Sequence, residues 1–303
     1  MKKLSIQLSL LTVICVCACT KSYNNQGTPN GSYTLQSAFA SLAVLPKTVT
    51  INAGTGGTFA GNRGTRYIVP AGAFKKSDGT IVTGNVDVTV SEFVKKSDML
   101  FSGVLPITAT DALISGGETN LTAKQGGQDL QMAPGKKYQA NIPQKNPTPG
   151  LSLFTGTKDP VTNTVIWKPA NDTSGQIIYN GDTVSILSTN VNFANADRFF
   201  TNPQYQSFTI SLSADGIAMN DSVAAFALFD NYNGVWPMMA IINHVVNESH
   251  LPSTPVHFAV ISIIKGNFYG GLLGVTPTTG SNYTMVLKKT TPSAFKAQID
   301  ALP

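Results

Sequence analysis

The sequence predicts an all-β protein, and three observations carry the prediction. Glutamate, which favours helices, occurs at only three of the 303 positions, whereas Val and Thr recur throughout the chain. Short runs with apolar side chains at alternate positions are separated by Gly, Pro, Asn and Asp. Only the C-terminal stretch shows the 3.6-residue apolar period of a helix. We therefore expect two antiparallel β-sandwich-like domains and one short C-terminal helix.

The composition excludes a disordered chain and argues against a nucleic-acid-binding protein. Hydrophobic residues make up 42% of the chain, and it has 15 Phe, 9 Tyr and 2 Trp residues. Charged residues make up only 12%, compared with about 25% in a typical soluble protein, so Thr, Ser, Asn and Gln must cover much of the surface. The net charge is +5, but the Lys residues are scattered as single residues and doublets. Such scattered charges usually form solvated edges, so we expect no nucleic-acid partner.

The first 18 residues form a leader rather than part of the fold. Lys2 and Lys3 precede an apolar stretch from Leu4 to Ala18, which is too short to span a bilayer. The stretch ends in the sequence Val-Cys-Ala-Cys at positions 16–19, which resembles the lipobox of bacterial lipoproteins. The resemblance implies that Cys19 receives a diacylglyceryl group and becomes the new N-terminus after cleavage. The alternative is an ordinary signal peptide that happens to contain cysteines.

The cysteine pattern agrees with lipidation. All three cysteines, at positions 15, 17 and 19, lie in this segment, so the mature domains would have neither a disulfide nor a cysteine nucleophile. Two or three acyl chains, such as palmitate, would anchor the protein almost permanently. We expect a bacterial cell-envelope protein at the outer membrane, on either its periplasmic face or the cell surface. The lipidated cysteine and the polar residues up to 33 then form a flexible tether.

The first domain is expected over residues 34–143. Its clearest strand runs from Val86 to Val90, with strict alternation of apolar and polar side chains, after a turn at Asp78-Gly79. Further strands are expected at Val49–Asn52, Arg66–Val69, Thr119–Ala123 and Tyr138–Ile142.

Residues 144–150 contain two prolines and a glycine and are expected to form a linker to a second β-rich domain at 151–303. The expected strands of the second domain are Leu151–Thr155, Thr164–Lys168, Ile177–Tyr179, Val184–Leu187, Phe208–Leu212, Val223–Phe229 and Phe258–Ile264. The helix is expected over residues 292–302, because Thr291 can cap it and Pro292 fits its first position.

A family resemblance supports the first domain. The residues that carry it lie in the segment Arg66–Gly103: they include Pro70, Gly79, Gly84 and the alternating valines 86, 88 and 90. Over about residues 50–143 the chain resembles a β-sandwich module of Bacteroidota-type envelope lipoproteins, which is itself similar to the ZU-type sandwich of ankyrins and netrin receptors. The resemblance implies a structural or binding role and supplies no catalytic residues.

The sequence contains no catalytic motif, and we expect neither an enzyme nor a cofactor. The GxSxG and HExxH patterns are both missing. His244, His250 and His257 lie close together in sequence, and Glu248 or Asp230 could complete a metal site with them. Their spacing and the nearby prolines instead favour a loop with ordinary histidines. We therefore assign neither a catalytic nor a metal site.

Aromatic side chains are the more plausible contact residues. Trp236 and Tyr232 lie in the polar segment that begins at Asp230, and exposed aromatics of this kind stack on sugars or anchor partner proteins. The alternative is that Trp236 closes the edge of the core. The expected function is a lipid-anchored, non-catalytic binding or structural module with a glycan or an envelope protein as partner. The runner-up is an envelope hydrolase that acts on glycan or peptide.

Overall fold

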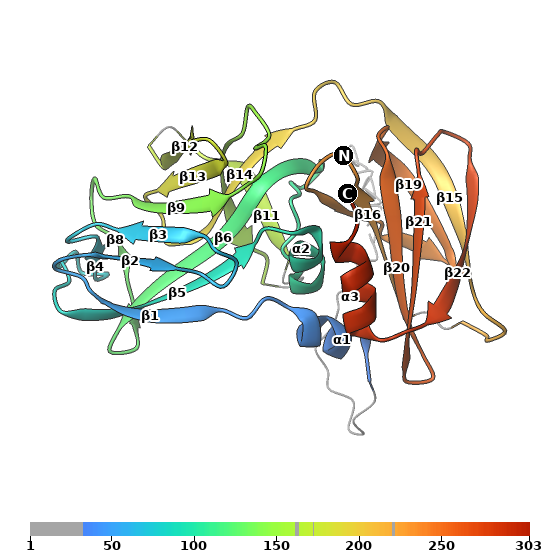
Figure 1. The fold of residues 1–303 in the computed structure, drawn as a ribbon, viewed down its shortest axis with the longest axis horizontal. Coiled ribbons are helices and arrows are strands. Elements are labelled where there is room, and N and C mark those ends of the chain that lie inside the picture. Colours follow the sequence, from blue (N-terminus) through green and yellow to red (C-terminus); the bar gives the residue numbers. More distant parts are fainter. Residues whose placement is uncertain (1–32, 161–163, 172, 220–221) are drawn as a thin grey trace, which may run out of the picture.

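The computed structural model describes residues 33–160, 164–171, 173–219 and 222–303. This part of the chain consists mainly of strands, with three short helices between two β-rich domains (Figure 1). The predicted all-β class is therefore confirmed. Cys19 and the expected tether up to residue 32 lie outside the described residues. None of the described helices has the length and apolar character needed to cross a membrane.

The first domain is a sandwich of two antiparallel sheets. The first sheet has the order β1 (Lys47–Asn52), β5 (Asn85–Phe93), β6 (Leu113–Gln125), β14 (Asn192–Phe199), β10 (Ser152–Lys158) and β11 (Val165–Pro169), with β7 (Gln128–Asp129) also beside β6. The second sheet has the order β12 (Gly175–Tyr179), β13 (Thr183–Ser188), β9 (Tyr138–Pro143), β3 (Arg66–Val69) and β2 (Gly57–Ala60). A short pair of β4 (Phe74–Lys75) and β8 (Gln131–Met132) lies apart from both.

The alternating valines of β5 explain how the two sheets pack. Val86, Val88 and Val90 are all at most 1% exposed and belong to one apolar cluster with residues of β9 and β13 in the opposite sheet. Their polar neighbours face outward; Thr50 donates a hydrogen bond to Asp87 at 2.6 Å. The period-two pattern thus predicts both this strand and its buried face.

The predicted linker at 144–150 is wrong, because the chain does not leave the sandwich there. β13 pairs with β9 and β14 pairs with β6, so strands from both sides of the segment share the same sheets. Residues 144–150 instead carry the chain from β9 in one sheet to β10 in the other. The first domain therefore extends to residue 199, and the chain crosses to the second domain at 200–204. Prolines and glycines mark a turn between sheets as readily as a turn between domains.

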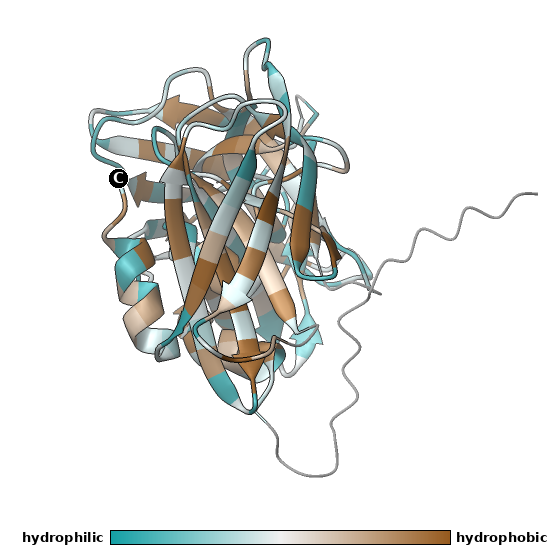
Figure 2. Cartoon of the chain, turned by 90° about the vertical axis from the view of Figure 1, so that its right-hand side faces the viewer, coloured by the Kyte–Doolittle hydropathy of each residue, from teal (hydrophilic) through white to brown (hydrophobic). Residues whose placement is uncertain are grey.

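The second domain is one eight-stranded sheet, which we call the rolled sheet. Its order is β17 (Val235–Pro237), β16 (Val223–Phe229), β20 (Val256–Ile264), β21 (Asn267–Val275), β22 (Asn282–Lys289), β15 (Tyr205–Ala214), β19 (Val245–Pro252) and β18 (Ala240–Ile242). The end strands β17 and β18 are separated in the chain by only Met238 and Met239, so the sheet rolls round until its ends meet. One pair, β15 with β22, is parallel, which differs from the expected antiparallel sandwich. Hydrophobic and hydrophilic residues alternate along several strands (Figure 2).

Three helices fill the junction between the domains. α3 (Pro292–Asp300) agrees with the predicted C-terminal helix, and the Thr291 hydroxyl accepts a hydrogen bond from the Ala294 amide at 3.2 Å. α1 (Leu35–Leu42) and α2 (Lys96–Ser102) were not predicted. Each is only two turns long, too short for an apolar period to show in the sequence.

The two domains share one hydrophobic core. A single cluster of buried side chains contains Phe101 of α2 and Trp167 of β11, together with Phe226 of β16 and Phe295 of α3. Trp167 is fully buried, and its indole nitrogen donates to the Leu105 carbonyl at 2.8 Å. The domains are therefore joined by apolar packing as well as by the chain.

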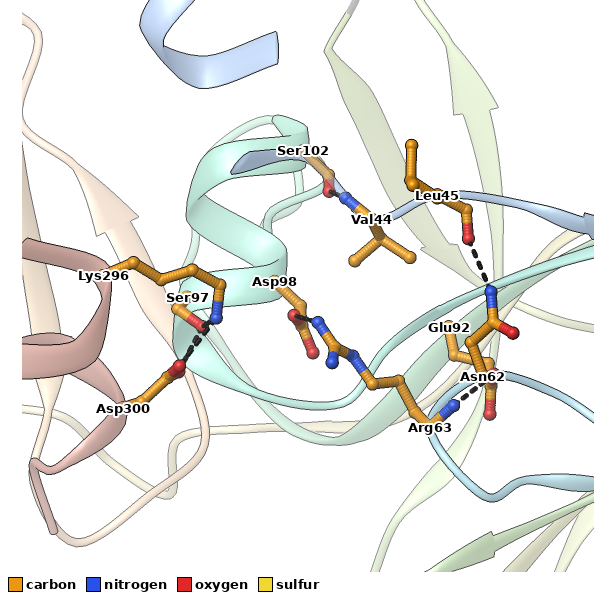
Figure 3. A network of polar contacts seen from close by, with 10 residues as sticks. All are labelled: Val44, Leu45, Asn62, Arg63, Glu92, Ser97, Asp98, Ser102, Lys296 and Asp300. Atoms are coloured by element: carbon orange, nitrogen blue, oxygen red, sulfur yellow. Dashed lines mark hydrogen bonds and ion pairs between the residues drawn. The ribbon is translucent and has the colours of Figure 1, made fainter. Parts of the chain in front are cut away.

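A partly buried ion pair fixes α2 to the sandwich (Figure 3). The Asp98 side chain is fully buried and pairs with Arg63 in the connection between β2 and β3. The backbone amides of Arg63 and Thr65 donate to the Glu92 carboxylate at 2.8 and 2.9 Å. Glu92 is 1% exposed, so it holds the Arg63 turn in place from the interior.

Two serines connect the same helix to the other helical segments (Figure 3). Ser97 contacts both Lys296 and Asp300 of α3, and Lys296 bridges to Asp300 at 2.7 Å. Ser102 accepts a hydrogen bond from the Val44 amide at 3.0 Å, just after α1. α2 is thus the element that joins the sandwich, α1 and α3 through its own side chains.

Candidate functional site

The loop between β16 and β17 lies in the junction between the domains. The Asn233 side chain donates to the Val94 carbonyl at 3.1 Å, and the Asn233 backbone carbonyl accepts from the Ser115 amide at 2.8 Å. Gly234 is buried, and a Cβ atom there would lie 2.8 Å from the Leu113 carbonyl oxygen. The sequence singled out this loop for its aromatics, and the structure shows that its backbone docks on the sandwich.

The loop carries Tyr232 into a cleft of about 410 Å³. The cleft is built from the first domain, the rolled sheet and residues 200–204, which connect the two and which we call the crossing segment. Its lining residues are Ile114, Arg198, Phe200, Thr201, Asn202, Pro203, Gln204, Tyr232, Pro252, Ser253 and Thr254. Its volume falls within the range of about 300–1,000 Å³ found for small-molecule sites. The predicted contact residue Tyr232 therefore lies in a cleft large enough for a ligand.

Arg198, the last but one residue of β14, brings a positive charge to this cleft. Its guanidinium carbon lies 5.9 Å from the centroid of the Tyr232 ring, within the range of a cation–π contact. Its Nη1 donates to the Phe199 carbonyl at 3.3 Å, and its Nε is buried with no hydrogen-bond partner. Among the described residues, no carboxylate lies within ion-pairing distance of it. The Nη atoms of the guanidinium therefore retain N–H donors that a ligand can use.

Trp236 occupies a different place from Tyr232. It lies in β17, it is partly buried, and it packs against both the junction cluster and the interior of the rolled sheet. Its indole nitrogen donates to Glu248 at 3.1 Å. It does not line the cleft. The two aromatic candidates are therefore separated, and this packing agrees with the core-edge alternative for Trp236.

The three histidines have different surroundings, and the prediction that their segment is a loop is wrong. His250 lies within β19 and His257 within β20, while His244 occupies the preceding turn with φ of 62°. His257 bonds to Asp230 at 2.6 Å. In the described ranges, no group of three or more His, Asp, Glu or Cys side chains is arranged to hold a metal ion.

His250 belongs to a polar contact across the junction. Its ring stacks on Tyr205, with centroids 3.7 Å apart, and its Nε2 lies 3.9 Å from the Asp111 carboxylate of the first domain. The Tyr205 hydroxyl donates to the same carboxylate at 3.0 Å. Hydrogen bonds from Thr110 and Tyr205, together with the nearby His250, lower the pKa of Asp111. This contact fastens the start of β15 to the sandwich beside the crossing segment.

The sequence did not reveal a pair of buried carboxyl groups inside the sandwich. Glu118 of β6 and Asp197 of β14 are both fully buried. Asn195 donates to both groups, at 3.2 Å to Glu118 and 2.5 Å to Asp197. Burial raises the pKa of both carboxyl groups well above the ordinary values, and the proximity of Asp197 raises that of Glu118 further. A substrate cannot reach the pair, so we assign it no catalytic role.

Comparison with known proteins identifies no family, since no family model matches the chain and no curated protein matches it significantly. The function is therefore inferred from the geometry of the junction. What that geometry offers is a cleft with an arginine that no described carboxylate neutralises, an aromatic ring and several hydroxyl and amide side chains.

Proposed function

We propose that the chain is a lipid-anchored protein of the bacterial cell envelope that binds a glycan or a partner protein without chemical reaction. The leader and Cys19 motif support the anchor. The cleft at the domain junction supports the binding role, because Arg198 lines it beside the Tyr232 ring and no described carboxylate pairs with this arginine. The position of Arg198 beside Tyr232 is the observation on which the proposal depends.

The composition of the cleft favours binding over hydrolysis. Glycoside hydrolysis commonly needs two carboxyl groups, and general acid–base chemistry needs a titratable group near the reacting bond. The cleft is lined by no Asp, Glu, His or Lys residue of the described chain. Arginine, amides and hydroxyls can hold a ligand, but they provide no proton donor or acceptor suited to neutral pH.

The anchor makes a direct prediction. Replacing Cys19 with serine should abolish metabolic labelling with a radioactive fatty acid, because a serine hydroxyl lacks the thiol that accepts the diacylglyceryl group. The protein should also be released from the membrane fraction or retain its leader. The measurement is autoradiography of the immunoprecipitated protein, with Cys17→Ser as the matched control that should keep its label. A wild-type protein without label would contradict the anchor.

The binding role makes a second prediction. Wild-type lipoprotein in detergent should co-sediment with at least one immobilised envelope fraction, either purified polysaccharide or membrane protein. Replacing both Arg198 and Tyr232 with alanine should weaken retention at least about tenfold, since loss of one contact residue at a hot spot typically costs about 2 kcal/mol. Arg66→Ala is the matched control, because Arg66 is exposed on β3 and away from the cleft lining.

Melting curves of the same proteins show whether a loss of retention results from unfolding rather than from a lost contact. The double variant should melt within a few degrees of wild type, because both side chains line a solvent-open cleft. If its retention equals that of wild type, the cleft is not the binding site. If no fraction retains the wild-type protein, the binding role itself fails.

A further inference from the structure

The charge of the cleft fits a ligand that places a single anionic group beside Arg198. Among the described residues, Arg198 is the only cationic side chain in the lining, and no acidic side chain lines the cleft to oppose it. A planar guanidinium matches a carboxylate through two parallel hydrogen bonds. Phosphate sites usually gather several donors from lysines, backbone amides or a helix N-terminus, and the cleft lining contains neither lysine nor helix. A carboxylate therefore fits this cleft better than a phosphate group.

The remaining lining suits a sugar better than a peptide. Besides Tyr232, five of the eleven residues carry hydroxyl or amide side chains, namely Thr201, Asn202, Gln204, Ser253 and Thr254. These groups both donate and accept hydrogen bonds, as ring hydroxyls require. The aliphatic part of the described lining consists of Ile114 and two prolines, and the remaining apolar surface comes from the flat rings of Phe200 and Tyr232, which suit the face of a sugar ring.

The aromatic ring of the cleft is held in a fixed orientation. Phe200 meets Tyr232 edge-on, with centroids 5.5 Å apart and an interplanar angle of 86°. Phe200 in turn packs on the buried Phe229, with centroids 5.0 Å apart. A ring supported in this way can pack against the C–H face of a sugar with little loss of rotamer entropy.

We propose that the junction cleft binds a saccharide that carries a carboxylate, with Arg198 pairing with the carboxylate and Tyr232 packing against the sugar ring. The inference rests on the proposed binding function and narrows its ligand to acidic glycans. The hydroxyl and amide side chains of the crossing segment and of the connection after β19 then contact the ring hydroxyls.

Calorimetric titration of the wild-type lipoprotein in detergent tests the ligand class. The probes are tetrasaccharides of galacturonate, glucuronate and mannuronate, the same tetrasaccharides with their carboxylates methyl-esterified, and a neutral tetrapeptide with a free C-terminal carboxylate. At least one acidic tetrasaccharide should bind, its ester should bind at least tenfold more weakly, and the peptide should not bind.

Two substitutions assign the contacts. Arg198→Gln should reduce the affinity for the acidic tetrasaccharide to that for its ester and leave the affinity for the ester unchanged. Tyr232→Ala should weaken both by a similar factor, whereas Tyr232→Phe should weaken neither, because it keeps the ring. Arg66→Ala serves as the control for loss of a surface arginine.

The outcomes separate this inference from the binding function. Equal affinity for acid and ester would overturn the role of the carboxylate but leave a sugar-binding cleft. Tighter binding of the peptide than of the acidic tetrasaccharides would overturn the assignment of a saccharide as the ligand. If none of the acidic tetrasaccharides binds, the ligand class is wrong, and the co-sedimentation experiment still decides on its own whether the cleft binds an envelope component.

Discussion

Replacing Arg63 with alanine should lower the free energy of unfolding by about 3–5 kcal/mol, because it leaves a buried carboxylate without its partner. Asp98 is fully buried in α2, and Arg63 is the only cation within ion-pairing distance of it in the described chain. At about 2–4 °C per kcal/mol for a protein of this size, the melting temperature should fall on the order of 10 °C. Thermal melting and urea denaturation measure the effect.

Two further variants separate charge burial from simple loss of contacts. Arg63→Ala combined with Asp98→Asn should be more stable than Arg63→Ala alone, since no unpaired charge remains in the interior. The exposed Arg66 provides the matched control, and Arg66→Ala should change stability by less than about 0.5 kcal/mol. An Arg63→Ala protein as stable as this control would show that the ion pair does not hold the helix in place.

The stability of the wild-type protein should decrease as the pH rises above the ordinary carboxyl pKa values of 4.5 and 3.8, because of Glu118 and Asp197. Burial raises both pKa values in the folded state, so the unfolded chain releases these protons first. Each proton retained only by the folded protein lowers the unfolding free energy by about 1.4 kcal/mol per pH unit. The loss continues until the pH passes the raised pKa values of the folded state.

Neutral amides should remove this dependence. Glu118→Gln and Asp197→Asn keep the size of the side chains and cannot ionise, so each variant should gain stability relative to wild type as the pH increases from 5 to 8. Urea denaturation at several pH values measures the slope. Asp129→Asn is the matched control, because the Asp129 side chain is 81% exposed. Parallel pH profiles for wild type and the amide variants would contradict the prediction.

The sequence predicted those parts of the fold that local patterns determine. The alternation from Val86 to Val90 and the capped helix after Thr291 correspond to β5 and α3. β14 was missed because it is buried on both faces, and the face with Asn195 and Asp197 is polar while the other carries only small alanines. Without β14 the sandwich could not be completed, and so the domain boundary was placed too early. Polar residues that satisfy one another inside a sheet are visible only once the strands are paired.

The sequence predicted only part of the candidate site, again because strand β14 was missed. Tyr232 and the turn-forming residues of its loop stand out in the sequence, and the structure places Tyr232 in the cleft. Arg198 could not be selected, because it belongs to the missed strand and no motif surrounds it. The pairing of this arginine with the tyrosine depends on the contact between the two domains, which leaves no trace in the local sequence.

The domains are held at three places: by the helices with their shared core, by the Asn233 loop that docks on the sandwich, and by the contact of Asp111 with Tyr205 and His250 beside the crossing segment. A two-domain protein with one connection can open and close about a hinge around its ligand, whereas large apolar interfaces oppose such motion. We therefore expect the cleft walls to keep their spacing when a ligand binds. For the proposed ligand this predicts lock-and-key recognition, in which binding is decided by fit to a preorganised surface and little free energy is spent on ordering the protein.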